Sequence, residues 1–247
     1  MEEQFLRTSL LLGKENIEKL FNCKVTVIGL GAVGSFATEI LARTGVGNLQ
    51  LVDFDTVQIT NINRQLFALH STLDKKKVDI AKQRVLDINP KCNVTTLDLF
   101  VNTDTLPEIF KDNDTDIVID AIDSYNPKLR LLEYCYKNNI KIISSMGAAL
   151  KTDPFQIKYA DLFETHHCKL AERLRGDLRS LGISKGIPCV FSEQSPQIKP
   201  IPLPQEEGKK YGKNGGPKIL GSTPVITGIF GILLANKAVS IITQKDN

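Results

Sequence analysis

The chain has 247 residues, of which 42% are hydrophobic and 24% are charged, and its formal net charge is +3 at pH 7. This length suits either one large α/β domain or two small ones, and the composition is ordinary for a soluble globular protein with a sizeable core. So mild a positive charge neither requires nor excludes a nucleic acid as a partner.

The five cysteines are scattered along the chain and form no CxxC pair. A tetrahedral zinc site usually draws its ligands from such closely spaced pairs, so we expect no zinc. An odd number of cysteines without a signal peptide favours a reducing compartment, and we therefore expect a cytoplasmic protein.

The first predicted unit begins at Lys24. Residues 24–28 are rich in β-branched side chains and end at the glycines of the sequence GLGAVG, after which apolar side chains recur at helical spacing. Residues 49–52 form a second apolar run that stops at Asp53. This order predicts a strand, a tight turn and a helix, followed by a second strand.

The alternation continues along the first half of the chain. Helices are predicted at 76–88 and 127–136, and strands at 94–99, 117–119 and 141–145. The strand at 117–119 is apolar at every position, as expected of a strand buried on both faces. Strands that alternate with helices predict an α/β fold with a doubly wound, mainly parallel, Rossmann-like sheet and right-handed crossovers.

The pattern loosens after Gly147. A strand is predicted at 155–159 and a charged helix at 167–181, and the proline- and lysine-rich run at 198–216 has the composition of a mobile loop. We expect a single domain over residues 1–247. Its first half, about 1–150, would bind a nucleotide, and its second half, about 151–247, would extend the sheet and form the substrate and dimer surfaces.

Residues 219–243 are long and apolar enough to raise the question of a membrane span. Pro224, Asn236 and Lys237 interrupt the segment, and a lysine is costly in hydrocarbon. We therefore predict a buried or dimer-packing helix and no obligate membrane contact, with membrane association as the minor alternative.

The sequence GLGAVG carries glycines at positions that suit a phosphate. Gly29 permits a tight turn, Gly31 lets the backbone approach the phosphate, and Gly34 lets the helix pack on the sheet. The amides at the start of the helix favour an anion. Asp53 ends the next strand, where a carboxylate can accept hydrogen bonds from ribose. On these features alone NAD and ATP are both candidates.

The residues that follow distinguish the two nucleotides. Arg64 can offer a bidentate fork to phosphate oxygens, Lys77 a point charge at a helix start, and Asp123 a carboxylate at the carboxyl edge of the sheet that can hold Mg²⁺. A hydride-transfer enzyme does not need extra cations, because its diphosphate is inert. Taken singly, these residues read as surface charges or a helix cap. Together they favour attack of a carboxylate on the α-phosphate of ATP.

The sequences GLGAVGS, LVDFD, TNINRQ and DAIDS, together with the lysine of KKKV, resemble the nucleotide site of the ubiquitin-activating-enzyme superfamily and its bacterial adenylyltransferase relatives. These enzymes convert a carboxylate and MgATP into an acyl adenylate and pyrophosphate. The resemblance implies Asp53 on the ribose, Asn61, Arg64 and Lys77 on the phosphates, and Asp123 near Mg²⁺ and the reacting carboxylate.

The same resemblance adds three further residues to the predicted ATP site. Asp55 and Gln65 adjoin the implied ligands and are included in the ATP site. Many relatives reach the partner subunit's phosphates with an N-terminal arginine, for which Arg7 is the counterpart. A trans-acting Arg7 implies a homodimer.

Further stretches, among them RTSLLLGKENIEKL, VIDAIDSYNPK, SSMGAALKTDPFQI and GSTPVITGIFG, are similar to the tRNA threonylcarbamoyladenosine dehydratases, and this similarity covers nearly the whole chain. It implies ATP-dependent adenylation of the threonyl carboxylate of N6-threonylcarbamoyladenosine in tRNA. The carbamoyl group then closes a hydantoin or oxazolone ring. The substrate would be tRNA, and a sulfur-transfer accessory protein is a further candidate partner. Basic residues at helical spacing are candidates for a stripe that binds tRNA, and a solubilising surface is an equally favoured alternative: Lys169, Arg173, Arg175 and Arg179.

One stretch departs from this family. Where the family often has a DP-containing turn before its basic helix, this chain has the run Glu164–Lys169, with His166, His167 and Cys168 inside it. Adjacent side chains on a helix point in different directions, so surface or capping roles are favoured over a metal site. Cys168 or Cys189 is a candidate thioester nucleophile, although the apolar surroundings of Cys189 favour a buried one.

Two other functions remain open at this point. The first is adenylation of the C-terminal glycine of a ubiquitin-like sulfur-carrier protein, and the second is a non-catalytic nucleotide-binding or NAD-dependent protein. Only the adenylating functions require Arg64 and Lys77.

Overall fold

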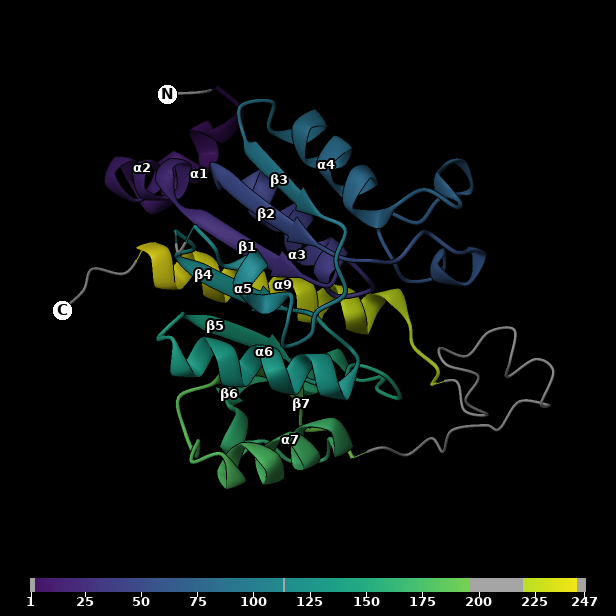
Figure 1. Cartoon of the computed structure of the whole chain (residues 1–247). Helices are drawn as coiled ribbons and strands as arrows, with labels where there is room; N and C mark the ends of the chain where they lie inside the picture. The colour runs from purple at the N-terminus through teal and green to yellow at the C-terminus, as the bar shows by residue number, and fades with distance from the viewer. Residues whose placement is uncertain (1–2, 113, 196–219, 244–247) are drawn as a thin grey trace.

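The computed structural model describes residues 3–112, 114–195 and 220–243. Its centre is a seven-stranded sheet in the order β3-β2-β1-β4-β5-β7-β6 (Figure 1). All neighbouring pairs are parallel except β6 and β7, which are antiparallel. The predicted doubly wound, mainly parallel α/β fold, extended by C-terminal strands, is confirmed.

The five strands of the first half are β1 (Lys24–Ile28), β2 (Asn48–Val52), β3 (Asn93–Leu97), β4 (Ile117–Asp120) and β5 (Ile142–Ser145). The predictions are right to within two residues at each boundary. The second half adds β6 (Ile157–Asp161) and β7 (Pro188–Ser192). The strand predicted at 155–159 therefore begins later, because a 3-10 turn at Pro154–Gln156 precedes it, with Asp153 accepting a hydrogen bond from the backbone N–H of Phe155.

Helices cover both faces of the sheet. The helices on one face are α3 (Gly34–Thr44), α4 (Lys77–Ile88) and α9 (Pro224–Thr243), and those on the other are α5 (Leu106–Ile109), α6 (Tyr125–Lys137) and α7 (Lys169–Ser180). The strands supply both cores because their side chains alternate: Val27 and Ile119 belong to one core and Ile28 and Val118 to the other. The helix predicted at 167–181 is α7, which begins two residues later than predicted, because Cys168 is its N-cap.

Two further helices, α1 (Leu6–Leu12) and α2 (Lys14–Asn22), precede the sheet. The backbone N–H of Gly47, just before β2, donates to Leu20 O at 2.9 Å, which fixes α2 beside the amino ends of the strands. α1 lies next to α2, and the rings of Phe5 and Phe21 are 5.5 Å apart. These helices therefore stand at the edge of the sheet opposite the carboxyl ends (Figure 1).

The apolar segment near the C-terminus forms α9, which is long and apolar enough to cross a membrane but is half-buried in the protein. Phe230 and Leu234 are fully buried, and an added Cβ at Gly231 would lie 2.3 Å from Val33 O, so α9 packs directly on α3. The prediction of a buried helix is confirmed. The predicted mobile loop at 198–216 lies outside the described residues.

Candidate active site

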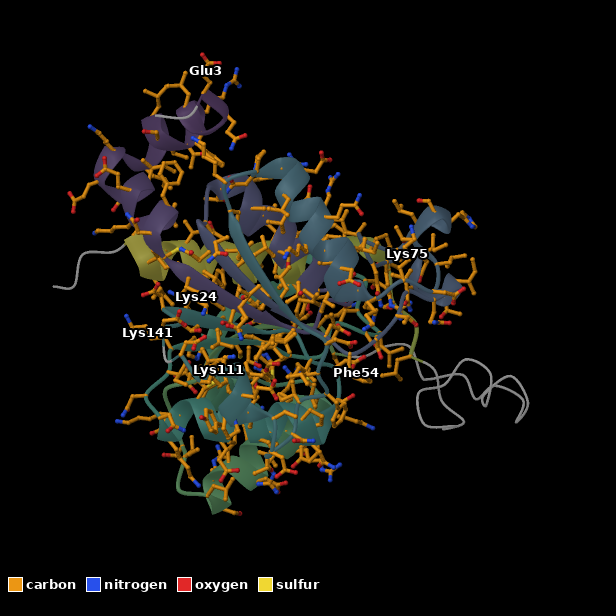
Figure 2. The ribbon with its side chains drawn as sticks, turned by 45° about the horizontal axis from the view of Figure 1, so that its top comes forward. Glu3, Lys24, Phe54, Lys75, Lys111 and Lys141 are labelled. Carbon is orange, nitrogen blue, oxygen red and sulfur yellow. The ribbon has the colours of Figure 1, made fainter. Side chains whose placement is uncertain are left out.

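The predicted site lies where the strand order reverses. β1 pairs with β2 on one side and β4 on the other, and Ile28 aligns with both Val52 and Asp120, so the three carboxyl ends are level. Open α/β sheets bind ligands at such a switch point. In Figure 2, Lys24 and Lys141 mark the amino ends of the strands, whereas Phe54 and Lys75 lie at the opposite side.

The glycine loop begins at the end of β1. Gly29 has φ +90°, and an added Cβ would lie 2.8 Å from Ala121 O, so a side chain is excluded by both strain and space. An added Cβ at Gly34 would lie 1.7 Å from Gly29 O, which explains the close approach of α3. At Gly31 the nearest atom would be Gln65 Nε2 at 3.6 Å. The protein alone does not require a glycine there, in keeping with a role toward a ligand.

Asp53 connects the loop to the end of β2. Its Oδ2 accepts a hydrogen bond from the backbone N–H of Leu30 at 2.6 Å, and its Oδ1 accepts one from that of Asp55 at 2.8 Å. The side chain is buried, and burial raises the pKa of Asp53, whereas the Lys77 charge and these hydrogen bonds oppose the shift. Asp53 thus fixes the loop itself, which is more than the ribose contact that sequence reasoning assigned to it.

Lys77 is the first residue of α4 and points back to the same edge. Its Nζ lies 2.9 Å from Asp55 Oδ2, and its backbone N–H donates to Asp55 O at 3.0 Å. Only 4% of Lys77 is exposed, so this ammonium group is held inside the site. Lys76, by contrast, pairs with Asp98 at the surface. The structure brings Asp53, Asp55 and Lys77 together.

The segment after Asp55 folds over the glycine loop. Asn61 ends the 3-10 turn Ile59–Asn61, where its Oδ1 accepts a hydrogen bond from the N–H of Gln58 at 3.0 Å. The carbonyl of Asn61 accepts from the N–H groups of both Arg64 and Gln65. Gln65 is buried, and the N–H of Leu66 donates to Ser35 Oγ at 3.1 Å. These contacts fix the segment against the start of α3.

Arg64 lies close enough to Asp123 for their charges to interact. Burial lowers the pKa of Arg64, and the negative charge of Asp123 opposes that change, so the two groups interact electrostatically. Arg64 Nη1 donates to Thr60 O and to Asn63 Oδ1, both at 2.8 Å. These bonds hold one edge of the guanidinium group and orient it.

Asp123 follows β4 in the turn before α6. Its carboxylate is exposed and accepts a hydrogen bond from Ser124 Oγ at 3.2 Å. One accessible carboxylate beside a phosphate site fits Mg²⁺, which uses one or two carboxylates, several waters and substrate phosphates. Asp123 is thus the side chain that would hold the ion.

Arg7 is not part of this arrangement within one chain. It lies exposed on α1, at the amino edge of the sheet. Figure 2 shows Glu3, just before α1, on the opposite side of the molecule from Phe54 and Lys75. A contribution of Arg7 to the site requires a second copy.

Sequence reasoning missed a buried ion pair beneath Asp123. Lys128 and Asp120 are both fully buried, with Lys128 Nζ 2.5 Å from Asp120 Oδ2. Ser144 Oγ donates to the same oxygen at 2.6 Å, and Asp120 Oδ1 accepts from the N–H of Ile122 at 3.0 Å. The pair therefore fixes the turn that carries Asp123. The available signal was a lysine among the apolar positions of a helix.

Sequence reasoning also missed the cavity beside Asp55, whose volume is about 710 Å³. One wall contains Phe54 and Phe100, whose rings meet edge to face at 4.9 Å. The other wall contains Tyr125, Arg130 and Arg173. A volume of this size suits a nucleotide-sized ligand. The signal in the sequence was an aromatic residue two to three positions after each of β2 and β3, where the carboxyl edge of the sheet lies.

In the run Glu164–Lys169, where the sequence departs from the family pattern, Cys168 is the N-cap of α7. Cys168 Sγ accepts hydrogen bonds from the N–H groups of Ala171 at 3.5 Å and Gly147 at 3.4 Å. The rings of His166 and His167 contact each other at 4.8 Å. Within the described residues no group of three or more His, Cys, Asp or Glu side chains could hold a metal ion. Cys189 is fully buried in β7, as its surroundings predicted.

These groups can carry out one kind of chemistry. The glycine loop offers backbone N–H groups, Arg64 and Lys77 offer positive charge, and Asp123 offers a metal ligand at the same edge of the sheet. Fixed cations beside a phosphate stabilise the charge that develops when a nucleophile attacks it. The arrangement thus suits transfer of a nucleotidyl group from ATP to a carboxylate.

Comparison with known proteins agrees with this geometry. The model of the ThiF family matches residues 4–247. The tRNA threonylcarbamoyladenosine dehydratase of Bacillus subtilis is 47% identical over 86% of this chain and 84% of its own length. The Escherichia coli protein of the same name is 34% identical over 98% of this chain and 94% of its own.

A solved structure extends the comparison to three dimensions. The E. coli tRNA N6-threonylcarbamoyladenosine dehydratase in complex with ATP superposes with a TM-score of 0.86 at 34% identity, covering 97% of this chain and 93% of that one. The shared fold thus spans both halves of the protein. This chain belongs to the ThiF family and, within it, groups with the tRNA threonylcarbamoyladenosine dehydratases.

Proposed function

We propose that this protein uses ATP to dehydrate and cyclise N6-threonylcarbamoyladenosine in tRNA. The observation that carries the proposal is the set of charged groups at the carboxyl edge of the sheet: Lys77 pairs with Asp55, and Arg64 interacts electrostatically with Asp123. The chain is also similar over most of its length to dehydratases of that name. An E. coli dehydratase binds ATP on the same fold.

The first step forms an acyl adenylate. A threonyl carboxylate oxygen attacks the α-phosphorus, the bond to the bridging oxygen breaks, and pyrophosphate leaves. Arg64 and Lys77 would stabilise the charge on the phosphates. Mg²⁺ on Asp123 would neutralise phosphate oxygens when bound.

The second step closes the ring. The carbamoyl group of the same nucleoside attacks the activated carbonyl carbon, the bond to the adenylate oxygen breaks, and AMP leaves while the attacking group loses a proton. The oxygen removed from the carboxylate departs on AMP, so the nucleoside loses one water overall. Holding both groups on one nucleoside makes this step intramolecular.

We also propose that the active form is a homodimer in which Arg7 of the partner subunit completes the phosphate site. Leu6, Leu10 and Leu11 on α1 are 48%, 76% and 83% exposed, an apolar surface next to Arg7 that a second copy can cover. Mixing inactive Arg7→Ala and Lys77→Ala proteins then restores activity to about one quarter of sites, as random exchange in a two-fold dimer gives. Mixtures that stay inactive contradict action in trans.

The test of function is pyrophosphate exchange into ATP with modified tRNA or with candidate carrier proteins. Exchange driven by the tRNA supports the proposal, whereas exchange driven by a carrier protein alone supports adenylation of a carrier instead. Arg64→Ala should reduce exchange by about a hundredfold or more while the fold is retained. Lys75→Ala, an exposed cation of the same region, is the matched control and should leave exchange unchanged.

A further inference from the structure

The cavity beside Asp55 has two walls of different character. The wall that follows β2 and β3 contains Phe54, Asp55 and Phe100, and it continues from the Asp53 carboxylate and the Lys77 ammonium group. The wall formed by α6 and α7 contains Tyr125, Arg130 and Arg173. The first wall belongs to the ATP site described above, whereas the ATP chemistry assigns no role to the second.

The second wall contains a stacked pair. The guanidinium carbon of Arg173 lies 3.7 Å from the centroid of the Tyr125 ring. The phenol of Tyr125 donates a hydrogen bond to Asp177, one turn along α7 from Arg173. These contacts hold the ring and the guanidinium group against each other, so little side-chain freedom remains to be lost when a ligand binds. Arg173 is exposed, so the outer face of its guanidinium plane is available.

The stacked pair lies next to the reacting groups. Tyr125 follows Asp123 by two residues, and Ser124, between them, both lines the cavity and donates to Asp123 Oδ1 at 3.2 Å. A planar group stacked on Arg173 would therefore lie in the same cavity as the nucleotide and close to the proposed metal ligand. The substrate has such a group, because its carboxylate is attached to an adenine base.

Unpaired bases of RNA are recognised by stacking on aromatic rings and on arginine guanidinium planes. Arg173 and Arg130 also bring positive charge to this wall, which suits an anionic strand. Arg130 Nη1 forms an ion pair with Glu133 Oε2 at 2.9 Å. We propose that the Tyr125–Arg173 pair is the platform on which the modified adenine of the tRNA stacks, with its threonyl carboxylate directed toward Asp123. This inference rests on the proposed function and identifies where its substrate binds.

The test compares Arg173→Ala, Arg173→Lys and Tyr125→Leu with the wild-type protein. Two quantities are measured: the Kd for tRNA carrying the modification, without ATP, and the KM for ATP. Stacking of one base corresponds to roughly a ten- to hundredfold weaker Kd for tRNA in Arg173→Ala, with an unchanged KM for ATP. Arg173→Lys should fail to restore binding, because lysine keeps the charge but has no plane.

Arg43→Ala and Arg43→Lys are the matched controls. Arg43 is half-exposed on α3, on the opposite face of the sheet, and pairs with Glu39 at 2.7 Å. These variants should bind tRNA as the wild-type protein does. Equal weakening in Arg43→Ala and Arg173→Ala would show a general charge effect and overturn the platform.

Three other results would also overturn it. Restored tRNA binding in Arg173→Lys would show a phosphate contact in place of stacking. A KM for ATP that rises together with the Kd for tRNA would assign the pair to the adenine of ATP. Wild-type turnover combined with unchanged tRNA binding in Arg173→Ala would reject the platform and leave the function standing. The converse, weakened binding in Arg173→Ala but no cyclic nucleoside from the wild-type protein, would retain the platform and reject the function.

Discussion

Replacing Lys128 by methionine tests whether the buried ion pair supports the turn that carries Asp123. The substitution keeps the length of the side chain but leaves the Asp120 carboxylate, which is fully buried, without its cation. Ser144 Oγ and the N–H of Ile122 remain as its hydrogen-bond donors. Removing one partner of a buried ion pair costs about 3–5 kcal/mol of the free energy of unfolding.

The assay is urea denaturation followed by circular dichroism. Lys137→Met is the matched control, because Lys137 lies on the same helix and pairs with Glu133 at 2.7 Å but is 56% exposed. An exposed pair contributes only about 0–1 kcal/mol, so the control should change little. A Lys128→Met protein no less stable than the Lys137→Met protein would refute the argument.

A second variant separates the unpaired charge from other effects of the substitution. The double variant Asp120→Asn, Lys128→Met removes both charges and keeps an acceptor for the N–H of Ile122. It should recover most of the lost stability.

The remaining predictions concern packing, thiol reactivity and acid stability. In chemical denaturation, Gly34→Ala should lower the free energy of unfolding by about 1–3 kcal/mol or prevent folding, because its Cβ would lie 1.7 Å from Gly29 O. Gly176→Ala, in a helix with open space around it, should instead raise the free energy of unfolding by about 0.5–1 kcal/mol. Iodoacetamide at about pH 8 should modify Cys168 first in the native protein. Burial raises the pKa of Cys23 to about 12 and that of Cys92 to about 11, and it also raises the pKa values of Cys135 and Cys189. Peptide mass mapping that finds Cys23 or Cys189 modified first would contradict this. Burial favours a higher pKa for Glu39, but hydrogen bonds from Arg84 and Arg43 outweigh it and hold the pKa below its ordinary value of 4.5. The stability that these pairs contribute at neutral pH should therefore fade as the pH falls below that value. Glu39→Gln should remove this part of the acid dependence.

The sequence predicted the fold well because its signals are local. The apolar runs, the glycines after β1 and the position of Asp53 each depend on neighbours in the chain. The structure places the apolar runs in one sheet, and the glycines and Asp53 follow directly on its strands. The boundaries differ by a few residues where caps decide them, as at Cys168. α1 and α2 were not predicted as helices, since their existence depends largely on packing against the amino edge of the sheet.

The site was predictable only in part. Lys77, Asp55 and the Arg64 segment are close in sequence, so their convergence follows from one βα unit. The Lys128–Asp120–Ser144 contacts and the Tyr125–Arg173 pair join different helices and strands. No local pattern indicates such contacts, because they depend on how α6 packs against β5 and α7.

The most direct test of the central claim is mass spectrometry of the nucleosides from modified tRNA incubated with this protein and ATP. The account predicts that N6-threonylcarbamoyladenosine loses one water and becomes a cyclic nucleoside, with release of AMP and pyrophosphate, and that Arg64→Ala does not form it. Unchanged N6-threonylcarbamoyladenosine in the presence of folded, ATP-binding wild-type protein would contradict the account.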